Sequence, residues 1–210
     1  MDMDLYGVCV RVRPWRENDK MLSLLCEDGN VYDVLARGAL NPKYKLKFAA
    51  QLFSTGDYFL RSSKAGYYIL GGASFGELSF LGAASDPVAY SAACYACEIA
   101  HKCVQTENKS MYAQVLSSLG ELSSGNEKLR PALVCLKTVL VALSSCGYGE
   151  DFGDDEVGRA CKAVLNTEAG EASGANIDDA LALRLLKSYT VRFGGIFERV
   201  TSLNTLLSML

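Results

Sequence analysis

Hydrophobic and polar residues alternate in the first third of the chain, and this period of two predicts short β-strands. In the first strand, residues 5–13, three valines point to one side, and a cysteine and two arginines to the other: Val8, Val10 and Val12 against Cys9, Arg11 and Arg13. Further strands are expected at residues 21–26, 31–37, 49–62 and 66–73, with a hairpin turn at Glu27–Asn30. Five short strands with a long loop after the third are typical of an OB-type barrel.

The pattern changes to a helical period after about residue 78. Asp86-Pro87 predicts a helix start, because Asp caps helices and Pro is tolerated at the first helical position. Helices are expected at about residues 87–106, 109–123, 129–146, 155–165 and 177–193, with Asn176 capping the last, Gly194-Gly195 interrupting it and a short amphipathic helix within 196–210. The predicted fold class is α+β: an N-terminal OB-fold β-barrel, residues 1–78, followed by an all-helical domain, residues 79–210.

Charge is distributed unevenly along the chain. The formal net charge of the 210 residues is −3, which argues against a wholly basic nucleic-acid binder. Residues 1–80 contain 10 basic and 9 acidic residues, a net charge of +1, whereas residues 81–210 contain 11 and 15, a net charge of −4. Any nucleic-acid surface is therefore expected to be local and to lie in the N-terminal part.

One segment of that part is purely basic. Arg37, Lys43, Lys45 and Lys47 lie within eleven residues, and no acidic residue occurs between Asp33 and Asp57. Lysine and arginine bind phosphates and release counterions, so this loop predicts DNA contact; the alternative is an ordinary solvated loop. Tyr44 could stack on a base or pack on the barrel, and packing is the preferred interpretation of Trp15. The expected DNA-binding residues are Arg11, Arg13, Arg37, Lys43, Tyr44, Lys45 and Lys47, with the two strand arginines the weaker candidates.

Other chemistry finds little support in the sequence. Cys94, Cys97 and His101 resemble a metal site, but one helix supplies only two well-placed ligands, so no metal is expected. His101 is the only histidine, which weakens any catalytic scheme. Glu150, Asp151, Asp154, Asp155 and Glu156 form an acidic cluster without the regular spacing of a calcium loop. A metal-dependent hydrolase using this cluster remains a remote alternative, and neither an enzymatic activity nor a cofactor is expected.

The cysteines and the apolar runs suggest a compartment. Eight cysteines in a chain of this size suggest reduced thiols rather than a disulfide framework. The acidic start, Met1-Asp-Met-Asp, differs from a secretory signal, and the apolar runs fall short of a membrane span. A cytoplasmic protein without a membrane partner is expected.

Several short sequence motifs resemble those of the RecO family of bacterial recombination mediators. Trp15, Glu17 and Asp19 match an aromatic followed by acidic-x-Asp before the second strand. Ala36-Arg37-Gly38-Ala39 matches the motif at the end of the family's third strand, and Asn41–Lys47 matches its basic loop. In the helical part, Ser145–Tyr148 matches a Leu-Gly-Tyr motif, and residues 185–207 match the family's closing helix and final segment. Many members carry a zinc site of two cysteine pairs after the Leu-Gly-Tyr motif. Residues 149–161, GEDFGDDEVGRAC, contain only Cys161, so no zinc is expected there.

The resemblance implies a non-enzymatic mediator that binds single- and double-stranded DNA, promotes annealing, and acts with RecR and single-strand-binding protein to load RecA. It also implies that the helical domain docks the acidic, apolar tail of single-strand-binding protein. Lys187, Arg192 and Arg199 are candidates for that pocket. The alternative is a protein–protein scaffold of the same fold with little DNA affinity, which the low pI and the missing zinc module favour.

Overall fold

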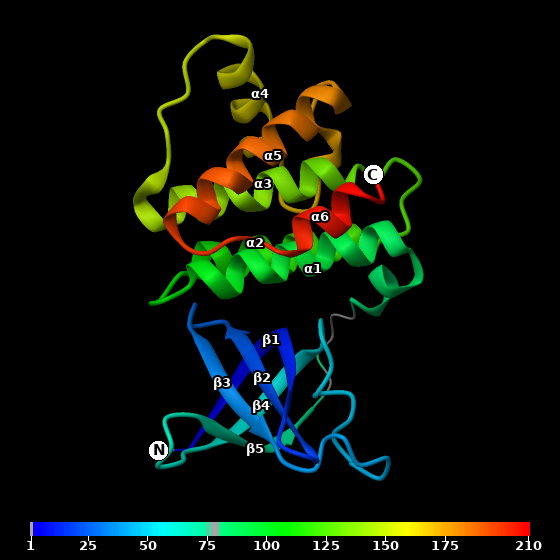
Figure 1. Ribbon diagram of the computed structural model, residues 1–210, viewed down its shortest axis with the longest axis vertical. Helices are drawn as coiled ribbons and strands as arrows, with labels where there is room; N and C mark the ends of the chain where they lie inside the picture. The colour runs from blue at the N-terminus through cyan, green and yellow to red at the C-terminus, as the bar shows by residue number, and fades with distance from the viewer. Residues whose placement is uncertain (1, 75, 77–79) are drawn as a thin grey trace.

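The computed structural model describes residues 2–74, 76 and 80–210. Five strands form a closed barrel in the order β1-β2-β3-β5-β4, which confirms the predicted OB-type barrel (Figure 1). They are β1 Met3–Trp15, β2 Asp19–Cys26, β3 Val31–Ala36, β4 Thr55–Arg61 and β5 Tyr68–Ala73. The fourth strand starts later than the predicted 49–62, because turns occupy most of 49–53. The predicted boundary at 78/79 falls outside the described residues.

A β-bulge in β1 changes which side chains face the barrel interior. The register with β2 shifts between Cys9 and Arg11. Cys9 and Val12 pack with the barrel interior, whereas Val8 and Val10 belong to the core shared with the helices. The predicted half-buried strand with three valines on one side is therefore wrong: an extra residue in one strand reverses the alternation, and the strand is buried on both faces near its middle.

The helices follow the predicted order. They are α1 Pro87–Cys103, α2 Lys109–Leu122, α3 Pro131–Leu143, α4 Glu156–Leu165, α5 Asp179–Ile196 and α6 Ser202–Leu207. Asp86 caps α1 as predicted, since its carboxylate accepts a hydrogen bond from the Ala89 N–H at 2.7 Å. Two details of α5 were predicted wrongly from the sequence. Asp178, rather than Asn176, caps this helix, and the helix continues through Gly194-Gly195 because packing outweighs the low helix propensity of glycine.

The helices stack above one end of the barrel (Figure 1). α1 contacts β1, β2, α2, α3 and α6, and α3 is the central helix, with contacts to α1, α2, α4 and α5. The β2–β3 turn meets the start of α2, where the Asn108 N–H donates to the Gly29 carbonyl at 2.9 Å. A Cβ at Gly29 would lie 2.7 Å from backbone nitrogen atoms of Asn108 and Lys109, so this contact requires glycine. The barrel is thereby fixed to the helices at its β2–β3 end.

The central helix is strongly apolar. By length and composition alone, residues 131–148 would suffice to cross a membrane, with a mean hydropathy of 1.5. From the sequence, the apolar runs are expected to be too short for this. Of this segment, 61% is buried inside the protein. Leu133, Leu136 and Val139 are completely buried in the shared core, which is the environment of the middle helix in a bundle.

A buried carboxylate holds the segment before α5. Glu121 of α2 is 8% exposed, and its side chain accepts hydrogen bonds from the N–H groups of Ala172 (2.9 Å) and Ser173 (2.7 Å). Nearby, the Lys137 ammonium donates to the carbonyls of Thr167 and Glu168. Residues 167–176, a run of mostly small and acidic residues, are thus fixed to α2 and α3 by polar side chains of those helices.

Candidate nucleic-acid interface

The basic loop starts from a fixed turn. The Gly38 N–H donates to the Asp19 carboxylate at 2.7 Å, and the Leu40 N–H donates to the Asn18 carbonyl at 3.0 Å. Gly38 has a φ of +70°, which an L-residue adopts only with strain. This hydrogen bond explains why the structure has an aspartate at position 19 and a glycine after Arg37. It also places the loop beside the β1–β2 turn, at the end of the barrel opposite the contact with α2.

Side chains of the loop alternate between solvent and barrel. Tyr44, Leu46 and Phe48 are partly buried and pack against the barrel core. The basic side chains between and before them are exposed: Arg37, Lys43, Lys45 and Lys47. None of these four forms an ion pair with any residue in the described part of the chain. Their charge is therefore available to an external anion, whereas burial raises the pKa of Tyr44 and its ring lies partly against the protein.

Aromatic residues gather at the same end of the barrel. Trp15 ends β1 and meets Tyr67, before β5, edge to face with ring centroids 6.4 Å apart. The Arg13 guanidinium lies 5.2 Å from the Trp15 ring centroid. This contact joins the β1–β2 and β4–β5 turns, the two turns with which OB-folds bind oligonucleotides. Sequence reasoning missed Tyr67 and the exposed Lys64 of the second turn; only the topology of the barrel brings them to the basic loop's end.

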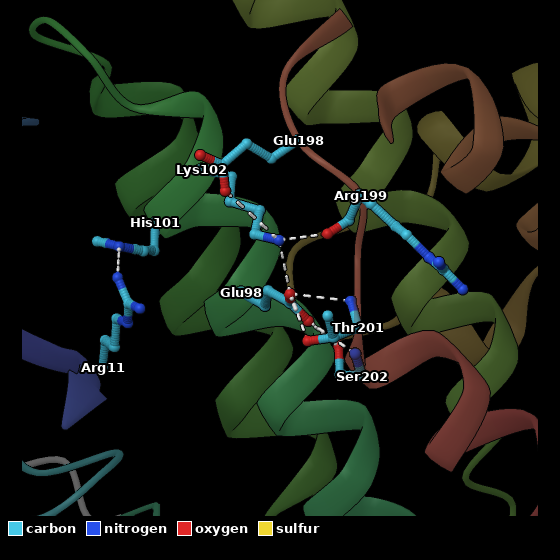
Figure 2. Close-up of polar contacts among 8 residues, drawn as sticks. All are labelled: Arg11, Glu98, His101, Lys102, Glu198, Arg199, Thr201 and Ser202. Atoms are coloured by element: carbon cyan, nitrogen blue, oxygen red, sulfur yellow. Dashed lines mark hydrogen bonds and ion pairs between the residues drawn. The ribbon is translucent and has the colours of Figure 1, made fainter. Parts of the chain in front are cut away.

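Arg11 lies apart from the other predicted cations. It faces a groove of about 380 Å³ between β1 and α1, and its Nη1 is 2.7 Å from Nε2 of His101 (Figure 2). Because arginine only donates hydrogen bonds, Nε2 must be unprotonated. Burial, followed by the charge of Arg11, lowers the pKa of His101. This hydrogen bond joins the barrel to the helices.

The pH dependence of stability should report this contact. A histidine whose pKa is lowered by folding is protonated first in the unfolded state, so the free energy of unfolding decreases as pH falls below the ordinary histidine pKa of about 6.5. His101 is the only histidine. We expect a His101→Gln variant to lose that part of the decrease, measured by urea unfolding between pH 5 and 8. Parallel curves for wild type and variant would contradict the contact.

On the neighbouring turn of α1, Glu98 holds the C-terminal segment (Figure 2). Its carboxylate accepts hydrogen bonds from backbone and hydroxyl groups of Thr201 and Ser202, and it pairs with Lys102 at 2.8 Å. Burial opposes ionisation, but the contact with Lys102 and the hydrogen bonds from Ser202 and Thr201 outweigh it and lower the pKa of Glu98 to about 2. The Glu98 carboxylate thus holds the start of α6 against α1.

The candidate metal ligands of α1 lie in different environments. Cys97 is buried in the core, Cys94 is partly buried, and His101 accepts from Arg11. Within the part of the chain that the structure describes, no three His, Cys, Asp or Glu residues are placed to hold a metal ion together. In the acidic cluster, Asp155 caps α4 by accepting from the Gly158 N–H at 2.7 Å.

A second cleft lies on the helical part. Apolar side chains of α3, α4 and α5 line a cavity of about 140 Å³, together with Arg192. Arg192 also lines a neighbouring cavity with Arg184. The Glu150 carboxylate pairs with Arg192 and accepts a hydrogen bond from the Tyr189 hydroxyl at 3.0 Å. The other two residues predicted to bind the peptide tail, Lys187 and Arg199, are not among the residues that line these two cavities. Lys187 is exposed on α5, and the Arg199 carbonyl accepts a hydrogen bond from Lys102.

A closed OB-type barrel followed by a helical bundle defines the structural class of this protein. The family model for the N-terminal part of recombination protein O matches residues 1–75. DNA repair protein RecO of Clostridium perfringens (strain 13 / Type A) is 28% identical over 148 residues, which cover 70% of this chain and 58% of that protein. DNA repair protein RecO of Dehalococcoides mccartyi (strain CBDB1) is 29% identical over 177 residues, covering 82% of this chain and 68% of that protein.

These matches confirm the resemblance to the RecO family that the sequence motifs of the barrel predicted. The match to the Clostridium protein spans less than two thirds of that relative's length.

Proposed function

We propose that this protein acts in DNA repair and recombination as a non-enzymatic DNA-binding mediator. The observation that carries the proposal is the exposed basic side of the loop: Arg37, Lys43, Lys45 and Lys47 have no ion pair within the described chain and project from a loop fixed to the barrel. Flexible cations of this kind bind phosphates of any sequence. The names of the two relatives support a role in repair.

The surface would extend over the end of the barrel. It would include Arg13 and Trp15 at the end of β1 and Lys64 and Tyr67 in the connection between β4 and β5, beside the turns with which OB-folds bind oligonucleotides. Tyr44 would support the loop from below. Arg11 lies outside this surface, and a role for it in DNA binding stays a prediction. We propose residues 1–78 as the DNA-binding domain and residues 79–210 as a docking domain.

Fluorescence anisotropy of labelled single-stranded and duplex oligonucleotides tests the proposal. Binding that weakens steeply and log-linearly with salt is expected, because each phosphate contact releases counterions. Annealing of complementary strands, followed with the same oligonucleotides, tests the mediator role. Absence of binding at low salt would contradict the DNA-binding function and leave the scaffold function.

A scaffold function is the second candidate, and the cleft around Arg192 favours it. A cation beside apolar walls suits an acidic, apolar peptide such as the tail of single-strand-binding protein. Glu150 already pairs with Arg192, so a partner carboxylate would have to replace it. RecR, and RecA through it, would be further partners, by analogy with the family alone.

Binding of a peptide with the sequence of that tail checks the cleft. We expect Arg192→Ala to weaken binding by about tenfold, because the peptide carboxylate loses its cation. Glu150→Ala should strengthen binding, since it frees Arg192. Lys187→Ala, on the exposed side of the same helix, is the matched control and should change affinity by less than about twofold. If Lys187→Ala and Arg192→Ala lowered the affinity for the peptide equally, the peptide would bind outside this cleft.

A further inference from the structure

Two thiols meet where the helical part contacts the barrel. Cys103 is the last residue of α1, and Cys146, 43 residues later, lies in the π-helical segment Ser144–Tyr148 that follows α3. The Cys146 thiol donates a hydrogen bond to the Cys103 carbonyl at 3.6 Å, and the Cys103 thiol donates to the Ala100 carbonyl at 3.7 Å. Both line a groove of about 330 Å³ that is open to solvent. The two cysteines are therefore in contact across two elements, and a disulfide between them would require both thiols to turn from these carbonyls toward each other.

The surroundings make the two thiols different. Cys146 is partly exposed, and the Asn108 side-chain amide donates to its sulfur at 3.7 Å. The neighbouring Cys103 thiol is the main cause that lowers the pKa of Cys146; burial opposes this, and Ser145 and Asn108 add to the lowering. The nearby Cys146 thiol and burial raise the pKa of Cys103, which is 4% exposed. A partly exposed thiolate beside a buried thiol is the usual arrangement of a nucleophilic and a resolving cysteine.

Cys94 provides an internal comparison. It is the other cysteine of intermediate burial, but burial raises its pKa. The remaining cysteines are buried: Cys9, Cys26, Cys97, Cys135 and Cys161. Cys146 is therefore set apart from the others by its partner thiol and its hydrogen-bond donors rather than by exposure alone.

We propose that Cys103 and Cys146 form a hydroperoxide-responsive thiol pair, with Cys146 as the nucleophile and Cys103 as the resolving thiol. The Cys146 thiolate attacks one peroxide oxygen, the O–O bond breaks, and Cys146 becomes a sulfenic acid while the other oxygen leaves as water. The Cys103 sulfur then attacks the Cys146 sulfur, and the hydroxyl leaves as a second water. Two thiols and one hydrogen peroxide give one disulfide and two waters, and the pair loses two electrons.

Asn108 couples this pair to the barrel. Its N–H donates to the Gly29 carbonyl of the β2–β3 turn at 2.9 Å, and its side-chain oxygen caps α2 by accepting from the Met111 N–H at 3.0 Å. Its amide nitrogen donates to Ser145 and to the Cys146 sulfur. In the disulfide the Cys146 sulfur is a weaker hydrogen-bond acceptor for Asn108 than in the thiolate, so the redox state would act on the contact between barrel and helices.

The test treats the full chain with a small excess of hydrogen peroxide and maps the thiols by mass spectrometry after alkylation and digestion. We expect a Cys103–Cys146 linked peptide in wild type and in the control variant Cys94→Ser. In Cys103→Ser, dimedone should trap the sulfenic acid on Cys146. In unmodified wild type, Cys146 should react with iodoacetamide at pH 7 about tenfold faster than Cys94.

The alkylation rates use the native protein, so they remain informative if a variant fails to fold. Equal rates for Cys94 and Cys146, or peroxide treatment that yields no Cys103–Cys146 link while other thiols oxidise, would overturn the proposal.

Discussion

Replacing Lys43, Lys45 and Lys47 with glutamate is expected to lower the affinity for single-stranded DNA by on the order of a hundredfold at low salt. All three side chains are exposed on the solvent side of the loop. Each phosphate contact contributes about 0.7 to the salt slope on single strands, so the slope should fall by about 2. Anisotropy titrations over a range of salt concentrations measure both quantities.

The control carries the same change of charge elsewhere. Lys109, Lys128 and Lys187 are exposed on the helical part, and their replacement by glutamate alters the net charge equally. If local contacts dominate, this variant keeps most of the affinity and the slope. If the two triple variants lose affinity equally, only the overall charge matters, and the basic loop is not the phosphate site.

Glu121→Ala should destabilise the protein by about 3 kcal/mol. The substitution leaves the buried N–H of Ala172 and the partly buried N–H of Ser173 without acceptors, and each such loss costs about 1–3 kcal/mol. It also removes a negative charge whose attraction partly offsets the burial that lowers the pKa of Lys137. Urea unfolding measured by circular dichroism checks the expected loss.

Two further variants make that result specific. Glu121→Gln keeps one side-chain oxygen as an acceptor and should lose less stability than Glu121→Ala. Glu127→Ala, an exposed glutamate six residues away, should change the free energy of unfolding by less than about 0.5 kcal/mol. Similar values for Glu121→Ala and Glu127→Ala would show that the carboxylate does not hold the segment before α5.

Local patterns predicted the elements but missed the places where long-range contacts override them. The start of α1 was predicted correctly because Asp86 and Pro87 act within one turn. The faces of β1 were predicted wrongly, since the bulge near Val10 depends on pairing with β2 and on packing against α1. Likewise, α5 continues through Gly194-Gly195, where local propensity predicts an end.

The candidate interface shows the same division. The charge of the basic loop is visible in the sequence, as is the Arg37-Gly38 motif. The hydrogen bond from Gly38 to Asp19, nineteen residues earlier, follows from the pairing of β2 with β3. Tyr67 reaches Trp15 only because β5 closes the barrel.

The sequence by itself determined the class of fold, the order of elements and the basic character of the loop, because hydrophobic period, capping and charge are properties of neighbouring residues. Only the tertiary structure decided which charges stand together. It directed Arg11 to His101 and away from the loop, and it brought Cys103 to Cys146. These pairings join residues 90 and 43 positions apart, and they depend on barrel closure and helix packing, which no local pattern encodes.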